Sequence, residues 1–233
     1  MIRRAPPTTV RSNVHPCARL SRMNSVPKIA ATLLAVLVLA SCGKSSDEPK
    51  SGSSDVSSPA ASPSESLSAG PSSTAKPSTG KAMAGNGYEY RLPKGWEDIT
   101  AQLKQNQPGI DTGGRAKPAT PPFTANMNTL NTPSKVSGQP TKDDLDALSA
   151  QIKGEVKSLA PKIQTKPNVT IAGAPAVHQE GDANSSGTKF YLVQYFVIYK
   201  NNNYGLTFAF PKSASAGARA KIVQPVLASW KWK

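Results

Sequence analysis

A cysteine thiol in a lipidation motif is the group with the clearest chemistry in this 233-residue sequence. The motif Leu39-Ala40-Ser41-Cys42 follows an uncharged apolar run, residues 29–39, which is itself preceded by Lys28. A run of about ten residues is too short to cross the ~30 Å hydrocarbon core of a membrane, so it predicts a cleaved export signal. Two small residues before the cysteine match a bacterial lipobox, in which the thiol receives a diacylglyceryl group and the signal is removed. The sequence therefore predicts lipidation of Cys42.

The start of this export signal is expected at Met23. Residues 1–22 contain five arginines and no hydrophobic periodicity, whereas residues 23–41 give a signal of 19 residues with one positive charge at its start. A core helix or a transmembrane anchor would not explain the small residues that end in a cysteine. We therefore expect residues 1–41 to be removed and the mature chain to be held at the extracytoplasmic face of the cell membrane by its lipid.

Few side chains that could perform hydrolysis remain once the signal is removed. His178 is then the one histidine, so a triad or a multi-histidine metal site would have to use a single imidazole. We expect it to be a surface or capping residue at a strand end. Asp111-Thr112-Gly113 matches the aspartic protease tripeptide, but that chemistry needs two such aspartates. We therefore expect no enzyme, no metal and no cofactor; the alternative is an envelope hydrolase that uses Asp111, Asp182 or His178.

Two further patterns have a structural explanation. Ser73 and Lys76 have the Ser-x-x-Lys spacing of a nucleophile and its base, but they lie in a stretch that cannot hold an oxyanion hole. Asp143, Asp144 and Asp146 could bind calcium. Because they follow the capping residue Thr141, their position in the positive first turn of a helix also accounts for them.

The mature chain is basic. Removal of residues 1–41 leaves 22 basic against 14 acidic residues, a net charge of +8. In a cytosolic protein this balance would favour nucleic-acid binding. Here the chain is exported, the basic residues are scattered, and no helix-turn-helix, RNP or zinc-finger pattern is present, so we expect no nucleic-acid partner. A basic module that binds anionic wall polymers or lipid headgroups stays open as an alternative.

Residues 43–82 have the composition of a disordered segment. They include 14 Ser, 5 Pro and 4 Gly among 40 residues and no aromatic side chain. Such a segment cannot bury enough apolar surface to offset the entropy lost on ordering. All 14 aromatic residues lie at or after Tyr88, so we expect a tether at residues 42–82 and a single globular domain at 83–233. About 150 residues are enough for one ordinary core.

Hydrophobic periodicity within the domain predicts a mixture of strands and helices. The strands are expected at 88–92, 123–130, 169–172, 176–180, 188–199 and 204–210, the helices at 97–106, 141–160 and 214–230, and a long loop at 107–122. Pro225 must kink the last helix or begin a second one. Strands in mostly antiparallel order with helices at both ends predict an α+β sandwich.

The longest predicted strand, residues 188–199, is apolar on both faces and should be central. In its neighbour, Gly205, Thr207 and Ala209 share a face of small side chains, which we expect the closing helix to cover. The odd-numbered face of the long strand carries tyrosines that suit protein or glycan contacts. The candidate binding surface is Tyr191, Tyr195 and Tyr199 together with Trp96. The alternative is that these rings pack beneath a helix.

Four short stretches, taken in order, resemble a known family. They are Leu92-Pro93-Lys94-Gly95-Trp96, Ala172-Gly173-Ala174-Pro175-Ala176, Tyr204-Gly205-Leu206-Thr207-Phe208 and Ser229-Trp230-Lys231-Trp232. Residues 86–232 resemble the LpqN-type lipoproteins, a group similar in fold to the photosystem II extrinsic protein PsbP. The resemblance implies an antiparallel sheet flanked by helices as an α/β/α sandwich, and a non-enzymatic binding or adaptor role. We expect the partner to be an unidentified envelope protein or glycan. The resemblance supplies no catalytic motif.

Overall fold

The computed structural model describes residue 70, residues 72–121 and residues 123–233. The predicted signal peptide, Cys42 and most of the predicted tether lie outside these residues. In the described part of the chain, no helix is long and apolar enough to cross a membrane.

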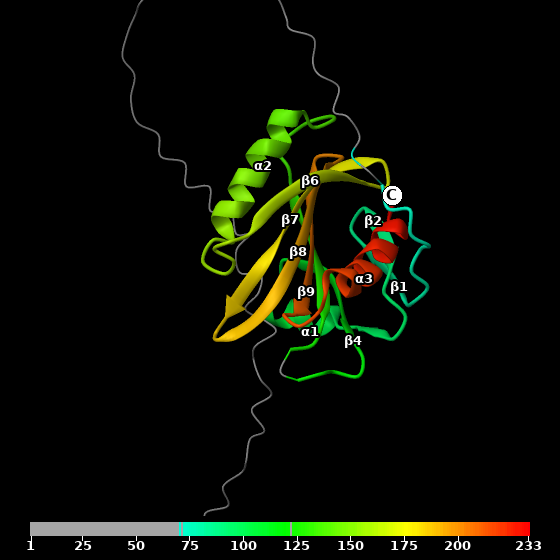
Figure 1. Ribbon diagram of the computed structural model, residues 1–233. Coiled ribbons are helices and arrows are strands. Elements are labelled where there is room, and N and C mark those ends of the chain that lie inside the picture. The colour runs from blue at the N-terminus through cyan, green and yellow to red at the C-terminus, as the bar shows by residue number, and fades with distance from the viewer. Residues whose placement is uncertain (1–69, 71, 122) are drawn as a thin grey trace, which may run out of the picture.

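Seven antiparallel strands form the main sheet (Figure 1). Their order is β3-β4-β5-β9-β8-β7-β6, so the long strand β8 is paired on both sides, as its two apolar faces predicted. The strands are β3 (Trp96–Asp98), β4 (Ile110–Ala116), β5 (Asn126–Pro133), β6 (Gln164–Ile171), β7 (Ala174–Ser185), β8 (Thr188–Tyr199) and β9 (Asn202–Pro211).

A smaller sheet and three helices cover this main sheet. The small sheet has the order β1-β2-β10, and it packs with α3 on one face of the main sheet, while α2 packs on the other. These elements are β1 (Ala82–Gly85), β2 (Tyr88–Arg91), β10 (Lys231–Trp232), α1 (Thr100–Asn106), α2 (Lys142–Glu155) and α3 (Ala216–Ala228). The fold is thus the predicted α+β class, an antiparallel sheet flanked by helices.

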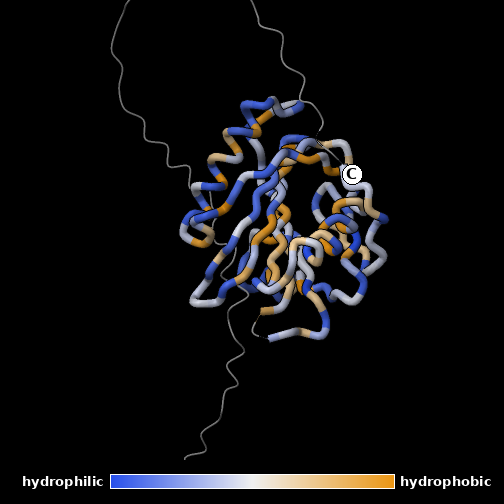
Figure 2. Tube along the Cα trace, viewed as in Figure 1, coloured by the Kyte–Doolittle hydropathy of each residue, from blue (hydrophilic) through white to orange (hydrophobic). Residues whose placement is uncertain are grey.

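Alternation along β8 divides the interior into two cores. Val193, Tyr195 and Val197 belong to the core beneath α3 and the small sheet. Phe190 and Leu192 belong to the core beneath α2. Because successive side chains of a strand point to opposite faces, one strand supplies both layers. The hydrophobic stretches accordingly lie inside the molecule and the outer loops are hydrophilic (Figure 2).

Helix α2 begins where its capping residue predicted. The Thr141 hydroxyl accepts from the Asp144 backbone N–H at 3.3 Å, and the Asp144 carboxylate accepts from the Thr141 N–H at 2.8 Å, which completes a capping box. Asp146 pairs with Lys142 at 2.6 Å. Helix capping therefore accounts for this acidic cluster, and the described residues contain no group of three or more side chains suited to hold a metal ion.

Strand β4 occupies seven of the sixteen residues that the sequence predicted as a loop, so the prediction was wrong for residues 110–116. A Cβ atom on Gly113 would overlap the Leu103 side chain of α1, and one on Gly114 would lie 2.5 Å from Leu92 Cδ2. These glycines allow α1 and the chain after β2 to approach the strand closely. The glycine content of this segment predicted a loop, but the glycines instead allow close packing. The predicted helix at 97–106 is also shorter, because β3 takes its first residues.

The last helix, α3, was expected to cover the face of β9 that carries Gly205, Thr207 and Ala209, but it covers the opposite face. Leu206 and Phe208 lie in the core beneath α3, whereas Ala209 lies in the core beneath α2. A Cβ on Gly205 would meet the Phe196 ring at 3.2 Å, so the small residues accommodate a ring of the neighbouring strand and not a helix. Pro225 lies inside α3, which continues past it as one helix.

The end of the predicted tether packs on the domain, so the boundary at residue 83 was placed too late. Ser78 is buried; its N–H donates to the Pro225 carbonyl at 2.8 Å and its hydroxyl donates to the Leu92 carbonyl at 2.6 Å. Lys81 pairs with Asp98 at 2.8 Å. These contacts of residues 72–82 are polar, and the segment contains no large apolar side chain, which is why composition did not reveal them.

Candidate functional site

The three residues of the hydrolase alternative do not converge. Asp111 lies on β4, whereas His178 and Asp182 lie on β7. Three strands, β5, β9 and β8, lie between β4 and β7 in the main sheet. At ~4.8 Å per strand, the separation is about 19 Å. Asp111 accepts from the Asn86 N–H at 2.8 Å, and Asp182 pairs with Lys212 at 2.7 Å. Each carboxylate therefore has a local partner, and no joint site for acid–base chemistry forms from them.

His178 lies in the middle of β7, so the prediction of a strand-end position was wrong. Its ring stacks on Tyr195 with centroids 4.6 Å apart, and its buried Nε2 has no hydrogen-bond partner among the described residues. Burial lowers the pKa of the imidazole, so the neutral form dominates at pH 7. Lys166 and Glu180 form an ion pair of 3.2 Å on neighbouring positions of the same face. The imidazole is thus a neutral packing partner of Tyr195.

The predicted tyrosine surface is largely covered. Tyr195 is 2 % exposed, the Arg219 guanidinium lies 3.6 Å from the centroid of the Tyr191 ring, and Tyr199 stacks on Trp232 with centroids 4.6 Å apart. Trp96 belongs to β3, which lies at the other edge of the main sheet from β6 and four places from β8 in strand order. The structure therefore brings the three tyrosines onto one face beneath α3 and β10, and leaves Trp96 apart.

A stack of three aromatic rings joins the small sheet to the end of the chain. Trp230 stacks on Tyr88 and Tyr90, with centroids 4.4 and 5.1 Å apart. Both tyrosine hydroxyls lie 3.1 Å from the Thr112 hydroxyl, which is also hydrogen-bonded to Thr129 at 2.7 Å. Burial raises the pKa of both tyrosines far above the usual range, so these phenols stay neutral. The stack is buried and serves as structure.

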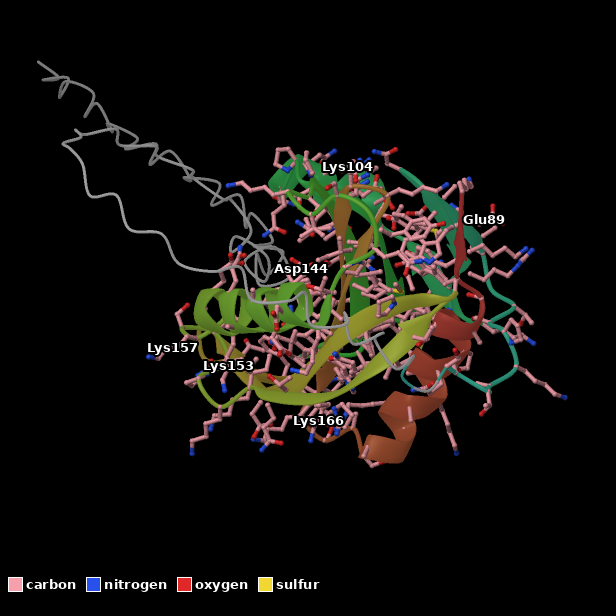
Figure 3. The ribbon with its side chains drawn as sticks, turned by 90° about the horizontal axis from the view of Figure 1, so that it is seen from above. Glu89, Lys104, Asp144, Lys153, Lys157 and Lys166 are labelled. Atoms are coloured by element: carbon pink, nitrogen blue, oxygen red, sulfur yellow. The ribbon has the colours of Figure 1, made fainter. Side chains whose placement is uncertain are left out.

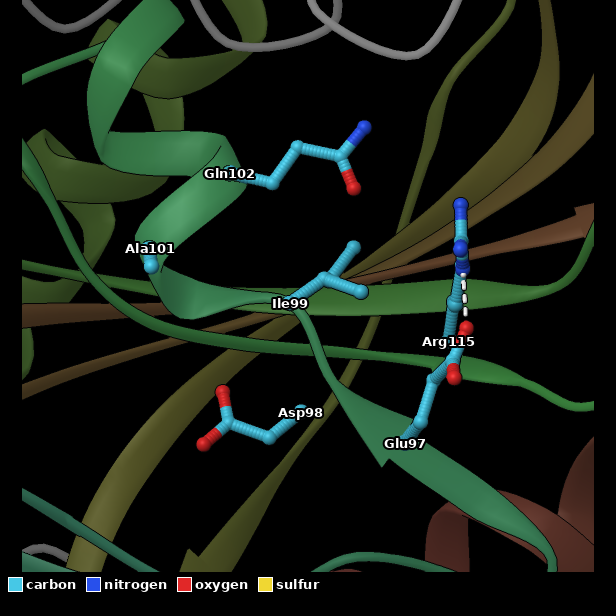
Figure 4. Close-up of a pocket in the computed structure, with 6 residues that line it drawn as sticks. All are labelled: Glu97, Asp98, Ile99, Ala101, Gln102 and Arg115. Atoms are coloured by element: carbon cyan, nitrogen blue, oxygen red, sulfur yellow. Dashed lines mark hydrogen bonds and ion pairs between the residues drawn. The ribbon is translucent and has the colours of Figure 1, made fainter.

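A polar cavity of about 350 Å³ lies where β3 leads into α1 beside β4 (Figure 4). Arg115 Nε donates to Glu97 Oε1 at 2.7 Å, and Lys117 Nζ lies 3.5 Å from Glu97 Oε2. Asp98 points away from Glu97 in the figure and pairs with Lys81. The lining residues are Glu97, Asp98, Ile99, Ala101, Gln102 and Arg115.

The charges of this cavity favour binding over proton transfer. The hydrogen bond from Arg115 lowers the pKa of Glu97. Burial raises the pKa of Asp98, but hydrogen bonds from Lys81 and Thr100 outweigh it, so this pKa is lowered as well. Both carboxylates are therefore ionised acceptors at neutral pH and neither can donate a proton. The sequence did not predict Arg115 as a site residue because it lies in the predicted loop. The alternating residues Ile110 and Thr112 were the signal that could have indicated a strand there.

The sequence matches no protein-family model and no curated relative. Similar solved structures include LpqN of Mycobacterium tuberculosis, described as involved in cell envelope biogenesis, with 14% identity over 64% of this chain and 85% of that one and a TM-score of 0.46. CyanoP, the PsbP of Synechocystis sp. PCC 6803, has 12% identity over 66% and 92% of the two chains and a TM-score of 0.47.

A protein from Bacteroides thetaiotaomicron VPI-5482 is also similar, with 16% identity, 66% of this chain covered and a TM-score of 0.45. The chain spans about half, 48%, of the length of that protein. The solved structures similar to this chain thus include an LpqN protein and a PsbP protein, the two groups that its sequence resembles.

Proposed function

We propose that this chain is an exported lipoprotein, held at the extracytoplasmic face of the cell membrane by a lipid on Cys42, with a non-catalytic binding or adaptor domain. The lipobox at Leu39–Cys42 carries the anchoring part of the proposal. Only 27 residues lie between Cys42 and Gly70, where the described part of the chain begins. Extended at ~3.5 Å per residue, they reach at most about 100 Å, so the domain stays within the envelope region next to the membrane.

The polar cavity at β3, α1 and β4 is the proposed binding site. Arg115 uses its Nε to bind Glu97, and the terminal guanidinium nitrogens and the Gln102 amide remain beside the cavity (Figure 4). Guanidinium and amide groups bind carboxylates, hydroxyls and peptide carbonyls. An open polar cavity of this kind suits a segment of an envelope protein or glycan better than an apolar small molecule, which needs an enclosed apolar pocket.

The geometry favours binding over hydrolysis. None of the six lining residues is a histidine, cysteine or serine that could serve as a nucleophile or base. Glu97 and Asp98 are adjacent in a strand and point to opposite sides, so they cannot work as a pair across one scissile bond. Asp111 and Asp182 lie on strands too far apart to substitute for them.

A basic module for anionic polymers is the second candidate. Residues 72–233 contain 20 basic and 10 acidic side chains, so the described part carries an excess of ten positive charges. Binding that depends on this overall charge should weaken steeply with salt. Binding in the polar cavity should depend instead on Arg115 and Gln102 and persist at moderate salt.

Lipidation is tested by replacing each of the two cysteines. We expect Cys42→Ala to abolish labelling with a radioactive or clickable fatty acid and to leave an unprocessed or released protein. Cys17→Ala is the matched control, since Cys17 lies upstream of the expected start and should not matter. Equal labelling of Cys42→Ala and the parent would refute the anchor.

The cavity is tested by NMR on the mature chain with Cys42→Ser. Soluble peptidoglycan fragments serve as the probe, and we expect amide shifts to concentrate at residues 97–102 and Arg115. Arg115→Gln should weaken binding by about tenfold, the value of one charge-assisted hydrogen bond. Lys94→Gln removes a nearby exposed charge and should have no effect. Shifts elsewhere, or equal losses for both variants, would contradict this site.

A further inference from the structure

A rim of aromatic and basic side chains surrounds the end of β10. Tyr199 and Trp232 stack with centroids 4.6 Å apart, and both residues are partly buried against the core and partly exposed. Lys200 Nζ lies 5.5 Å from the Tyr199 ring centroid and donates to the Lys233 carbonyl at 2.9 Å. The rim comprises Tyr199, Lys200, Lys231, Trp232 and Lys233.

The chain enters the described domain beside this rim. The Thr170 hydroxyl donates to the Gly70 carbonyl at 2.7 Å, and Ser72 forms a bridge with Thr170. The next residue, Ile171, accepts a hydrogen bond from Trp232 Nε1 at 3.1 Å. The entering chain and the rim thus contact two consecutive residues, Thr170 and Ile171. Figure 1 shows the entering chain next to the C-terminal end.

The charge of the rim is positive. The rim contains three lysines, and two of them, Lys231 and Lys233, each lie 3.7 Å from the Glu89 carboxylate. The lysine side chains are 73% and 49% exposed, so these ion pairs are open to solvent and weak. Lys200 pairs with no Asp or Glu side chain among the described residues, and its ammonium donates one hydrogen bond, to the Lys233 carbonyl. Because an ammonium has three N–H donors, it can also bind an anionic group.

We propose that this rim is the face through which the domain contacts anionic lipid headgroups of the membrane. Tryptophan and tyrosine rings favour the headgroup region because one end is apolar and the other polar, and lysines beside them attract anionic lipids. The proposal rests on the proposed anchor, which would hold the rim near the membrane. For the flexible chain that the sequence predicts, 27 residues have an r.m.s. span of about 29 Å, which corresponds to a millimolar effective concentration. A weak intrinsic affinity is then sufficient.

A second group of lysines lies elsewhere on the molecule and provides a control. Figure 3 shows Lys153 and Lys157 at the α2 side, across the molecule from Glu89, which neighbours the rim. No ion pair joins either lysine to a described carboxylate. Lys153 lies on α2 and Lys157 just after its end, and α2 contains no tryptophan or tyrosine. They match the rim lysines in charge but lack its aromatic rings and its closeness to the entry point.

The test uses the mature chain with Cys42→Ser, so that vesicle binding is measured without a lipid on the protein. We expect sedimentation with phosphatidylcholine vesicles that contain 30 % phosphatidylglycerol, little with phosphatidylcholine alone, and a blue shift of tryptophan fluorescence on binding. The double variant Lys200→Glu/Lys231→Glu should weaken binding by at least about tenfold, and Trp232→Phe by a smaller factor. Lys153→Glu/Lys157→Glu should change it less than about twofold.

Two results would overturn the rim as a lipid contact. Equal losses for the two double variants would assign the binding to overall charge. Competition by soluble teichoic acid at concentrations where phosphatidylglycerol vesicles bind weakly would assign the rim to a wall polymer. Since the protein carries no lipid in this experiment, a failure here is distinguishable from a failure of lipidation at Cys42.

Discussion

At the residue scale, Trp230 joins the last helix and the last strand to the core. It is 3 % exposed and stacks on Tyr88 and Tyr90. We expect Trp230→Ala to lower the free energy of unfolding by about 3–5 kcal/mol because it leaves a cavity between α3 and the small sheet. Trp230→Phe should cost less, since it keeps a stacked ring. Urea unfolding measures both, and an alanine variant as stable as the parent would contradict the docking of α3 through this ring.

The imidazole of His178 should make stability depend on pH as the pH falls below the ordinary histidine pKa of 6.5. Burial lowers its pKa in the folded state below the ordinary value of 6.5, so the unfolded chain binds the proton more readily. The stabilising effect of the neutral form is therefore complete above the unfolded pKa and is lost as pH falls from about 6.5 toward the lower folded pKa. We expect His178→Gln to flatten this part of the stability profile. A variant whose profile keeps the slope of the parent would show that another group titrates there.

At the element scale, close packing of α1 on β4 depends on glycine. A Cβ on Gly113 would overlap Leu103 and lie 3.2 Å from the Met127 carbonyl, so Gly113→Ala should destabilise the fold by about 1–3 kcal/mol. Gly154 of α2 has no atom within 4 Å of an added Cβ. Gly154→Ala should therefore stabilise by about 0.5–1 kcal/mol. Thermal unfolding measures both changes in stability. A stabilising Gly113→Ala together with a destabilising Gly154→Ala would refute the close packing of α1 on β4.

The segment before β1 should contribute to the stability of the domain. Deletion of residues 43–69 should leave the melting temperature unchanged, whereas deletion of 43–82 should lower it by removing the contacts of Ser78 and Lys81. Ser78→Ala alone should cost about 1 kcal/mol for one buried hydrogen bond. Thr79→Ala, at an exposed neighbour, is the control. Equal melting temperatures for the two deletions would restore the boundary at residue 83.

The sequence predicted those helices and strands whose hydrophobic spacing and capping residues lie within the element itself. The two apolar faces of β8 identified it as central, and Thr141 with the apolar stripe from Leu145 identified α2. Both signals arise from residues within one element, and burial on each face requires them. The α+β class followed from the order of these elements.

Features that depend on pairing between distant segments were not predictable in this way. Arg115 contacts Glu97 because β3 pairs with β4. The glycines of β4 made its sequence resemble a loop. Trp232 meets Tyr199 because β10 joins the small sheet. The face that α3 covers depends on Trp230 stacking on the rings of β2, which no spacing within β9 reveals. Each of these requires the strand order, which a single sequence does not specify.

At the scale of the whole molecule, the proposed functions occupy different ends. Figure 1 shows α1 and β4, which border the polar cavity, away from the C-terminal end of the chain, where the rim and the entering segment lie. A domain that contacts lipid headgroups through the rim would leave the cavity open to partners in the envelope. In the proposed arrangement, the lipid on Cys42 would hold the domain near the membrane and the cavity would supply the binding function.

Intact-mass spectrometry of the protein isolated from its native membrane tests the anchored arrangement most directly. We expect a chain that begins at Cys42 and carries the added mass of a diacylglyceryl group on that residue, with or without an N-terminal acyl chain. Partial proteolysis and peptide mapping would place the added mass on the first residue. A mature protein that begins elsewhere, or that begins at Cys42 with an unmodified thiol, would contradict the lipoprotein assignment.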